Sequence, residues 1–426
     1  MTIRISHTGD LHYSNTTLEE VERCMEAFVA SATSPSIDAI VIGGDSTDHR
    51  LDAHTPAFLA LARRVKQMAD VKPIIMLQGT FSHEPPGVLS LFGMLSDKVF
   101  VADRICQVAL TTSGLWMPST AFCFAVDEFE SLVALNGAPK AVFTCLPTVN
   151  KAILVASTGS TDSADLGNVV AQVLQGFAAS NDRFSCAGIP TIGMSHGTVH
   201  NSRTEHGVPM HGADHEFTSG SLFSAGCSAF TLNHIHLHQD WEVNGRRAAY
   251  SGSLPCLHYG EVGQKGWIEW TVDAKTSEFN FMPSPAQQFA EFNFSDVPDM
   301  EQLTCADVTG KKVRVRYVVD FEHRHVVNDD AIRAALVGAM EVNIEPRILP
   351  MLRTRAEGMS DASTDAEKLQ MWMTVTRTDR PQLLDCLVIL ATGDPESVAK
   401  ALMDHAMQLA RQSATTTQDV PELGAA

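Results

Sequence analysis

Short polar blocks sit at the ends of apolar runs at four places along this chain. They are Asp10-Leu-His12, Gly44-Asp45, Ser195-His196-Gly197 and His234-Ile-His236, and a fifth block, Ser82-His83-Glu84, falls between the second and third. An apolar run that ends in a polar block is typical of a buried strand whose carboxyl end reaches the edge of a sheet. Carboxylates and imidazoles collected in this way from distant segments are the ligand types of a two-metal centre. The pattern therefore constrains both the fold and the chemistry.

The first hundred residues alternate predicted strands and helices. The strands are predicted at 2–8, 39–42 and 73–77. Thr17-Leu-Glu-Glu20 has the form of a capping box that opens the first helix, and Thr55-Pro56 opens the second. The order βαβαβ predicts a parallel sheet of the α/β class, in which ligands gather at the carboxyl ends of the strands. Asp10, Asp45 and His83 fall at these ends.

Later segments predict a second sheet and smaller parts that follow it. Further strands are predicted at 191–194, 229–232, 248–250 and 266–272. Pro283-Ser-Pro285 indicates a boundary, so we expect one domain over residues 1–285. A smaller α+β domain is predicted over 286–355, from a strand at 311–319, a helix at 329–340 and a strand at 341–348. Residues 356–411 are predicted to be a linker and C-terminal helices, and 412–426 a disordered tail.

Charge argues against a broad nucleic-acid-binding surface. The chain has 31 Lys and Arg against 50 Asp and Glu, a formal charge of −19, whereas proteins that bind phosphates by counterion release usually carry a basic face. Lys312, Arg314 and Arg316 alternate on one side of a predicted strand. Two interpretations remain open for them, a solvated sheet face or an edge that contacts DNA phosphates.

Other composition features predict an intracellular protein. No apolar run approaches the ~20 residues that cross a bilayer, so we expect no membrane association. The nine cysteines include no CxxC pair and lie singly in mostly apolar segments. Such spacing is typical of buried thiols in a reducing compartment, which predicts a cytoplasmic location.

Two longer motifs carry a resemblance to a known family. His234-Ile-His236-Leu-His-Gln239, followed by Tyr250-Ser-Gly-Ser-Leu-Pro-Cys-Leu-His-Tyr-Gly-Glu261, resembles the GHxHxxQ block and the YSGS…GE strand-turn of SbcD-type double-strand-break-repair nucleases. These belong to the calcineurin-like metallophosphoesterases. The resemblance covers about residues 1–285, and more loosely extends to about 350.

The resemblance implies a metallophosphoesterase fold, a two-sheet αββα sandwich with a capping domain, and a nuclease activity. The expected reaction is two-metal hydrolysis of phosphodiesters in DNA, by exonuclease or endonuclease cleavage, in DNA end processing, repair or recombination. It also implies an SbcC-like coiled-coil ATPase partner at the C-terminal helices, and a homodimer. Mn²⁺ is the metal usual in the family, while the mixed carboxylate and imidazole ligands would also suit iron or zinc.

The resemblance also assigns roles to the polar blocks. One ion would be held by Asp10, His12 and His236, the other by His196 and His234, with the catalytic Asp45 as the bridge. His83 would be the acid that assists the leaving alkoxide. Glu84 would orient His83, and Asp48 would make a structural hydrogen bond.

The sequence departs from the family at two positions. The GNH[DE] turn is replaced by Gly79-Thr-Phe-Ser82-His83-Glu84, so the usual Asn ligand of the second ion is missing, and Ser82 is its aligned substitute. A water in that place, a contribution from Thr80, or looser binding of the second ion are the three expected outcomes. Asn233 replaces the glycine before His234, and asparagine tolerates the positive φ of such a turn.

Two other functions stay open at this point. The same centre would serve a phosphodiesterase or phosphatase that acts on a small nucleotide or a phosphoprotein. The missing Asn would also be consistent with a non-catalytic binding protein whose metal site has decayed. Substrate preference and metal content distinguish the three.

Overall fold

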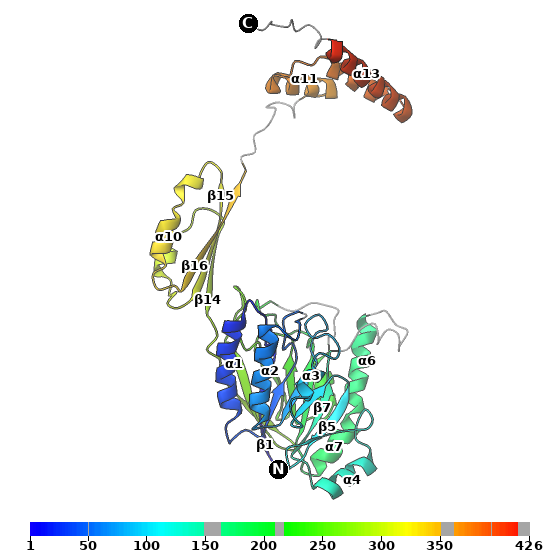
Figure 1. The fold of residues 1–426 in the computed structure, drawn as a ribbon, viewed down its shortest axis with the longest axis vertical. Coiled ribbons are helices and arrows are strands. Elements are labelled where there is room, and N and C mark those ends of the chain that lie inside the picture. Colours follow the sequence, from blue (N-terminus) through cyan, green and yellow to red (C-terminus); the bar gives the residue numbers. More distant parts are fainter. Residues whose placement is uncertain (50, 149–162, 209–216, 351–361, 393, 416–426) are drawn as a thin grey trace, which may run out of the picture. The chain divides into compact units, whose positions relative to one another are not determined.

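Two β-sheets, built from residues 3–283, pack face to face, as seen in the lower part of Figure 1. The computed structural model describes residues 1–426 except 50, 149–162, 209–216, 351–361, 393 and 416–426. It divides into a first unit, residues 1–318 with 327–347, and a second unit, residues 319–326 with 348–426. Both large sheets lie in the first unit.

The six-stranded sheet contains the predicted N-terminal strands. Its order is β13 (Ser277–Pro283), β12 (Gly266–Val272), β1 (Ile3–Thr8), β2 (Ala39–Ile42), β3 (Ile74–Leu77) and β4 (Val99–Ala102). Strands β1 to β4 run parallel, and β12 and β13 complete the sheet in antiparallel pairs. The predicted βαβαβ order is therefore present, with its polar blocks at one edge.

The seven-stranded sheet contains the strands predicted at 191–194, 229–232 and 248–250. The strand predicted at 266–272 for this second sheet is β12, which instead pairs with β1 in the six-stranded sheet. Its order is β10 (Gln239–Val243), β11 (Arg246–Tyr250), β9 (Ala229–Asn233), β8 (Thr191–His196), β7 (Ala141–Leu146), β5 (Cys106–Leu110) and β6 (Trp116–Pro118). Strands β7, β8, β9 and β11 run parallel to one another. Their carboxyl ends bear the polar blocks of the second half of the site.

Each large sheet is buried on both faces, which explains the nearly continuous apolar runs. On β2, Ala39 and Val41 face the second sheet, and Ile40 and Ile42 face the helices. The helices α1 (Leu18–Ala32) and α2 (Pro56–Ala69) cover the outer face of the six-stranded sheet. The outer face of the other sheet is covered by α4 (Val126–Asn136), α6 (Ser163–Gly176), α7 (Ala178–Cys186) and α8 (Ser219–Ser224). The predicted two-sheet αββα sandwich is thus confirmed.

A three-stranded sheet of order β14 (Phe289–Phe294), β15 (Lys312–Asp320) and β16 (Glu341–Leu349) follows the sandwich. The short helices α9 (Met300–Cys305) and α10 (Asp329–Ala335) lie between its strands in the sequence. Another short helix, α3 (Ser90–Gly93), precedes β4 in the sandwich, and a 3₁₀ turn spans Arg324–Val326. The predicted helix over 329–340 is wrong beyond Ala335. Gly338 has φ 95°, a left-handed conformation in which an α-helix cannot continue.

The basic alternation on β15 lies on an ion-paired sheet face. Lys312 pairs with Glu341 at 3.2 Å. Arg314 contacts Glu291 at 2.7 Å, and Arg316 contacts Glu291 and Glu345 at 3.1 and 2.7 Å. Three cations thus meet three carboxylates of the neighbouring strands, so a phosphate would have to displace an existing partner. These ion pairs favour the sheet-face interpretation of the two that the sequence allowed, and contact with DNA stays a prediction.

The C-terminal helices α11 (Asp365–Thr376), α12 (Gln382–Thr392) and α13 (Pro395–Thr415) lie in the second unit. Because α13 continues to Thr415, the start of the predicted disordered tail at 412 is wrong by four residues, and 416–426 lie outside the described residues. Among the described helices none has the length and apolarity needed to cross a membrane.

The capping box predicted at the start of α1 is also absent. Thr17 is the residue before the helix, but its side chain makes no capping hydrogen bond. Its hydroxyl contacts Ser14 Oγ at 2.7 Å instead. The Glu20 carboxylate accepts a hydrogen bond from the backbone N–H of Gln287, so tertiary contacts replace the local cap.

Candidate metal centre

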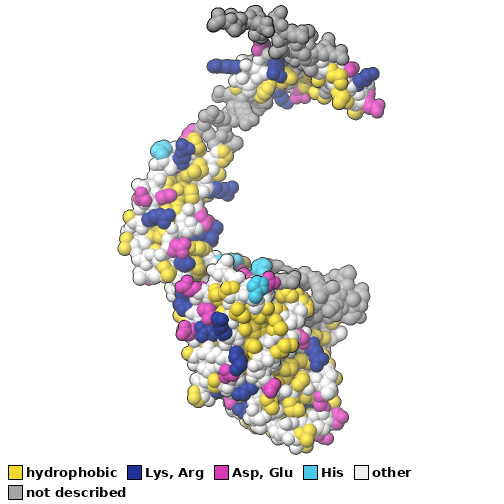
Figure 2. Space-filling view, in the orientation of Figure 1, with side chains coloured by type: hydrophobic (Ala, Val, Ile, Leu, Met, Phe, Trp, Pro, Cys, Tyr) yellow, Lys and Arg dark blue, Asp and Glu magenta, His cyan; other side chains and the backbone are white. Residues whose placement is uncertain are grey.

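Loops at the carboxyl ends of strands from both sheets meet at one end of the sandwich. Two backbone hydrogen bonds join the loop after β1 to the loop after β2, from Asp10 N–H to Gly44 O at 2.9 Å and from His12 N–H to Asp45 O at 3.0 Å. In Figure 2 the visible histidine side chains of this unit gather at one end, which in Figure 1 lies opposite the N-terminus. The site therefore depends on both sheets.

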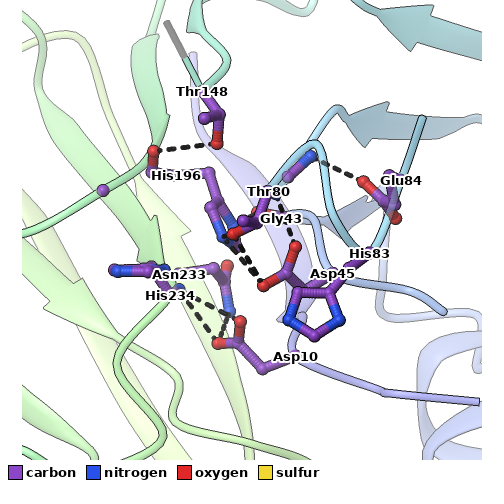
Figure 3. A network of polar contacts seen from close by, with 12 residues as sticks. Asp10, Gly43, Asp45, Thr80, His83, Glu84, Thr148, His196, Asn233 and His234 are labelled. Atoms are coloured by element: carbon purple, nitrogen blue, oxygen red, sulfur yellow. Dashed lines mark hydrogen bonds and ion pairs between the residues drawn. The ribbon is translucent and has the colours of Figure 1, made fainter. Parts of the chain in front are cut away.

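The six predicted metal ligands fall into two groups of three. Asp10, His12 and His236 form one, and Asp45, His196 and His234 form the other, with the ligand atoms of each group within 4.8 Å of one another. Figure 3 shows several of these side chains pointing toward a common centre. Two buried carboxylates with four imidazoles are a donor set that suits two divalent transition ions. The residues present thus fit the metal pair that the motifs predict.

Backbone strain is concentrated at the same positions. Asp10, His12 and Asp45 have φ of 47°, 46° and 49°, and His234 has φ 106°. These are left-handed conformations that cost a non-glycine residue about 1–3 kcal/mol each and persist where surrounding structure and function require them. Four of the six candidate ligand positions therefore have strained backbone conformations, which the stability of the fold alone does not explain.

Close approach of the loops also depends on glycine. A Cβ added to Gly44, which has φ 105°, would lie 2.5 Å from His196 Nδ1 and 2.8 Å from the Cα of Gly79. Any side chain at this position would push the loops after β2 and β3 apart. The glycines before Asp45 thus let the two groups of ligands share one small volume.

The histidine tautomers favour metal binding. His196 Nδ1 lies 2.9 Å from the carbonyl of Gly43. A carbonyl only accepts, so Nδ1 carries the proton and Nε2 is left as a ligand atom, as in most metal-bound histidines. His196 Nε2 lies 3.2 Å from Asp45 Oδ2.

Burial keeps His12 and His236 neutral. Desolvation lowers the pKa of His12 to about 4, although the charge of Asp45 opposes this shift. Desolvation, followed by the nearby His12, lowers the pKa of His236 well below its usual value. Their Nε2 atoms lie 2.9 Å apart. A neutral imidazole is the form that binds a metal ion.

The two carboxylates differ in electrostatic environment. Burial raises the pKa of Asp10 to about 7, with the charge of Asp45 adding to the shift against the opposing effect of His196. Burial also opposes ionisation of Asp45, but His196, His12 and His83 outweigh it and hold the pKa of Asp45 well below its usual range. Burial opposes protonation of His196, but the charge of Asp45 outweighs it and raises the pKa of His196 to about 9. Asp45 is thus the carboxylate that stays ionised at the centre.

Thr80, and not Ser82, lies beside the second group of ligands. Thr80 Oγ1 is 3.1 Å from Asp45 Oδ2 and 3.3 Å from His196 Nε2, and its backbone N–H donates to Asp45 Oδ1 at 2.6 Å. Ser82 is exposed. Ser82 directly precedes His83, as the Asn precedes the His in the family motif. In the structure, however, the residue that lies at the ligands is Thr80, which directly follows Gly79. Of the predicted outcomes for the missing Asn, this geometry favours a contribution from Thr80 over one from Ser82.

His83 stands at the rim of the centre. Its ring centroid is 4.9 Å from that of His12, and its side chain is 21% exposed. The backbone N–H of His49 donates to His83 Nδ1 at 3.0 Å, so the neutral ring carries its proton on Nε2. Asp48 Oδ1 lies 3.6 Å from His83 Nδ1 and 2.6 Å from His49 Nδ1. His83 therefore offers a donor nitrogen next to the metal ligands.

The predicted role of Glu84 as the residue that orients His83 is wrong. Its buried carboxylate accepts hydrogen bonds from the backbone N–H groups of Ser46 and Gly79, both at 2.6 Å. Burial and the charge of Asp45 raise its pKa to about 7. Glu84 thus joins the loop that carries Asp45 to the loop that carries Thr80. His83 is positioned by its own backbone carbonyl, which accepts from Thr47 Oγ1 at 2.6 Å, and by His49.

Asn233 has a larger role than the turn residue that the sequence predicted. It is fully buried, and its Oδ1 lies 2.7 Å from His7 Nε2. Its Nδ2 donates to Asp10 Oδ2 at 3.2 Å and to Ser251 Oγ at 2.9 Å. Trp270 Nε1 donates to His7 Nδ1 at 3.4 Å, which places the His7 proton on Nε2. A chain of donors thus runs from Trp270 through His7 and Asn233 to the candidate metal ligand Asp10.

The YSGS…GE motif supports the ligand loops from behind. The Tyr250 hydroxyl donates to the carbonyl of Gly197 at 2.5 Å and accepts from Val199 N–H at 2.8 Å, which holds the loop after His196. Lys265 pairs with the buried Glu261 and donates to the carbonyl of His236 at 3.0 Å. The motif therefore fixes the backbone beside two ligands and does not itself reach the centre.

Comparison with known proteins finds similarity only among solved structures. No protein-family model and no curated protein sequence matches the chain. The solved structures include the GAP50 anchor of the inner membrane complex of Plasmodium (11% identity, TM-score 0.39, 67% of this chain and 85% of that one). A dimetal phosphatase from Danio rerio matches at 9% identity and TM-score 0.38, over 66% of this chain and 98% of that one. Phosphopantetheinyl hydrolase from Mycobacterium tuberculosis matches at 11% and 0.32, over 59% and 89%. These values assign no activity, so the proposed function depends on the site.

A pH-dependent contribution to stability follows from His7. Desolvation lowers its pKa to about 4 from 6.5, although the hydrogen bond that His7 Nε2–H donates to Asn233 Oδ1 opposes the shift. Below pH 6.5 His7 binds a proton in the unfolded chain but not in the folded chain. The free energy of unfolding therefore falls as the pH drops from 6.5 to 4. The loss should reach about 3 kcal/mol. In chelator, the His7→Gln variant should lose less stability than wild type over this range in urea unfolding. Equal slopes would contradict the assignment.

The position of Thr80 predicts which hydroxyl supports the second ion. Thr80→Val keeps the shape and removes Oγ1, and should weaken binding of the second Mn²⁺ by about 10–100-fold. Ser82→Ala, the matched control on the same loop, should leave both binding constants unchanged. Calorimetric titration with Mn²⁺ measures the effect. Weakening by Ser82→Ala alone would restore Ser82 as the substitute for the missing Asn.

Proposed function

We propose that this protein is a two-metal phosphodiester hydrolase, and most specifically a DNA nuclease that acts on DNA ends or single strands. The observation that carries the hydrolase proposal is the meeting of six candidate ligand side chains, four of them buried and two partly buried, in two groups of three beside His83. The restriction to DNA rests on the resemblance of the His234–Gln239 and Tyr250–Glu261 motifs to those of SbcD-type nucleases.

The residues of this chain would have the following roles in hydrolysis. Asp10, His12 and His236 would hold one ion, His196 and His234 the other, and Asp45 both, with Thr80 beside the second group. Two bound divalent ions, with Mn²⁺ the proposed metal, supply Lewis-acid stabilisation of the phosphoryl oxygens and activate a water nucleophile. His83 Nε2–H would give its proton to the departing alkoxide oxygen.

Phosphate contact is proposed at the centre itself and not along β15. Arg314 and Arg316 already share Glu291, and Lys312 pairs with Glu341. Together with the formal charge of −19, this leaves the metal ions and a partner protein as the main sources of positive charge for DNA. Such an arrangement predicts weak DNA binding in chelator.

An SbcC-like ATPase is the partner that we propose for the C-terminal helices. Large apolar side chains on all three helices are 37–68% exposed, at Met371, Val375, Leu390, Met403 and Met407. Exposed apolar side chains on amphipathic helices are typical of a surface that packs against another helix. The proposal of a cytoplasmic location follows from this partnership with a DNA-processing ATPase.

The activity can be tested directly. With Mn²⁺, the purified chain should degrade linear DNA, and Asp45→Asn should abolish hydrolysis because both groups of ligands lose their shared charge. Gel assays of DNA length measure the effect. Hydrolysis of small phosphodiesters without any cleavage of DNA would instead favour the phosphodiesterase alternative. A wild-type chain that retains no metal would favour the non-catalytic one.

The role of His83 as the acid can be separated from a structural role by leaving-group dependence. His83→Gln should lower kcat on DNA by about 10²–10⁴-fold, because the departing alkoxide needs a proton. On bis(p-nitrophenyl) phosphate, whose leaving group needs none, the loss should be smaller than about 10-fold. His54→Gln removes an exposed histidine and serves as the control. Equal losses on both substrates would exclude the acid role.

A further inference from the structure

A second group of metal-binding side chains lies outside the candidate centre. Glu205, His206 and His258 present one ligand atom each, and these atoms lie within 4.8 Å of one another. Glu205 and His206 lie in the loop between β8 and α8, and His258 lies in the loop between β11 and β12. None of the three is a ligand or supporting residue of the candidate centre.

Both imidazoles are oriented as metal-bound histidines are. His206 Nδ1 lies 3.3 Å from the carbonyl of Gly260, and His258 Nδ1 lies 2.8 Å from the carbonyl of Tyr259. Since a carbonyl only accepts, each Nδ1 carries the proton and each Nε2 presents a lone pair. Backbone carbonyls commonly fix metal-ligating histidines in this way.

One pair of the three side chains lies at a spacing that suits a metal ion. His206 Nε2 lies 3.3 Å from Glu205 Oε1, and two ligands of a tetrahedral zinc ion with bonds of about 2.0–2.1 Å are separated by about 3.3–3.4 Å. The ligand atom of His258 lies within 4.8 Å of the other two, while His258 Nε2 also lies 3.3 Å from Oε1 of the buried Glu261, outside this group. The distances therefore suit either a shared ion or imidazole–carboxylate pairs without one.

The two loops are held together by their backbones. Val262 N–H donates to the carbonyl of Glu205 at 2.7 Å. Gly260 has φ 88°, which turns the loop so that its carbonyl reaches His206. The Lys265 ion pair fixes Glu261 in the interior. The ligands thus project from a preorganised pair of loops, which lowers the cost of ordering a site.

We propose that Glu205, His206 and His258 bind one Zn²⁺ ion at the surface of the first unit. Two imidazoles and one carboxylate favour zinc over Mg²⁺ or Ca²⁺, which prefer all-oxygen ligands. The fourth position is filled by water. This inference does not rest on the proposed nuclease function, because it involves other residues and no substrate.

The ion would stiffen the loop against which the three-stranded sheet packs. Tyr259 contacts Phe289 of β14 with ring centroids 4.7 Å apart, and the Arg314 guanidinium of β15 lies 4.4 Å from the Tyr259 ring centroid. His258 immediately precedes Tyr259. Zinc therefore acts as a structural tie between the loops of the sandwich and the base of this sheet.

Zinc stoichiometry of the full chain tests the proposal. After removal of metals, wild type should bind one more equivalent of Zn²⁺ than the double variant His206→Gln/His258→Gln. Glu205→Gln, which leaves both imidazoles in place, should weaken this equivalent by at least about 10-fold. Zinc should also raise the Tm of wild type more than that of the double variant. Equilibrium dialysis with elemental analysis and thermal unfolding provide the readouts.

The controls separate this site from the candidate centre. His54→Gln/His325→Gln removes two exposed histidines elsewhere and should retain the wild-type zinc content. The difference of one equivalent should persist when Asp45→Asn is added to both wild type and the double variant, whatever happens at the candidate centre. Equal zinc content and affinity in wild type and the double variant would overturn the proposal and leave only imidazole–carboxylate pairs.

Discussion

The apolar layer between the two large sheets is the interaction on which the rest of the structure depends. It joins Ile5, Val41 and Leu77 of one sheet to Phe143 and Met194 of the other, all fully buried. Burial of a large aliphatic or aromatic side chain stabilises the fold by about 1.5–3 kcal/mol. Because this layer fixes the sheets face to face, the carboxyl ends of β1, β2 and β3 meet those of β8 and β9.

Asn233 lies where that layer ends and the candidate metal centre begins. A Cβ added to Gly43 would lie 1.7 Å from its Oδ1, and one added to Gly9 would lie 2.3 Å from its Nδ2. The amide therefore fills space that only glycine leaves open at the ends of β1 and β2. In return it connects His7, which lies beside the buried Trp270, to the ligand Asp10. Packing and ligand position are thus coupled through one side chain.

The local sequence pattern predicted most strands well, because an apolar run bounded by polar residues indicates a buried strand without knowledge of its tertiary contacts. The runs at 39–42 and 266–272 became β2 and β12 with the same bounds. The wrong predictions concern side chains that take other partners than the expected local ones. The Thr17 hydroxyl contacts the nearby Ser14 and does not cap the helix, while Glu20 accepts a hydrogen bond from the distant Gln287. Glu84 was predicted to orient the adjacent His83, but its carboxylate accepts hydrogen bonds from the backbone N–H groups of Ser46 and Gly79.

The sequence by itself determined the ligand types, their order and their places at strand ends, because these depend on periodicity and on residue chemistry. Only the tertiary structure decided that Thr80 and not Ser82 approaches Asp45, and that the cations of β15 are paired with Glu291, Glu341 and Glu345. The physical reason is the same in both cases. Which side chains meet is set by the packing of the sheets and by strand pairing, and neither leaves a signal within any short segment of the chain.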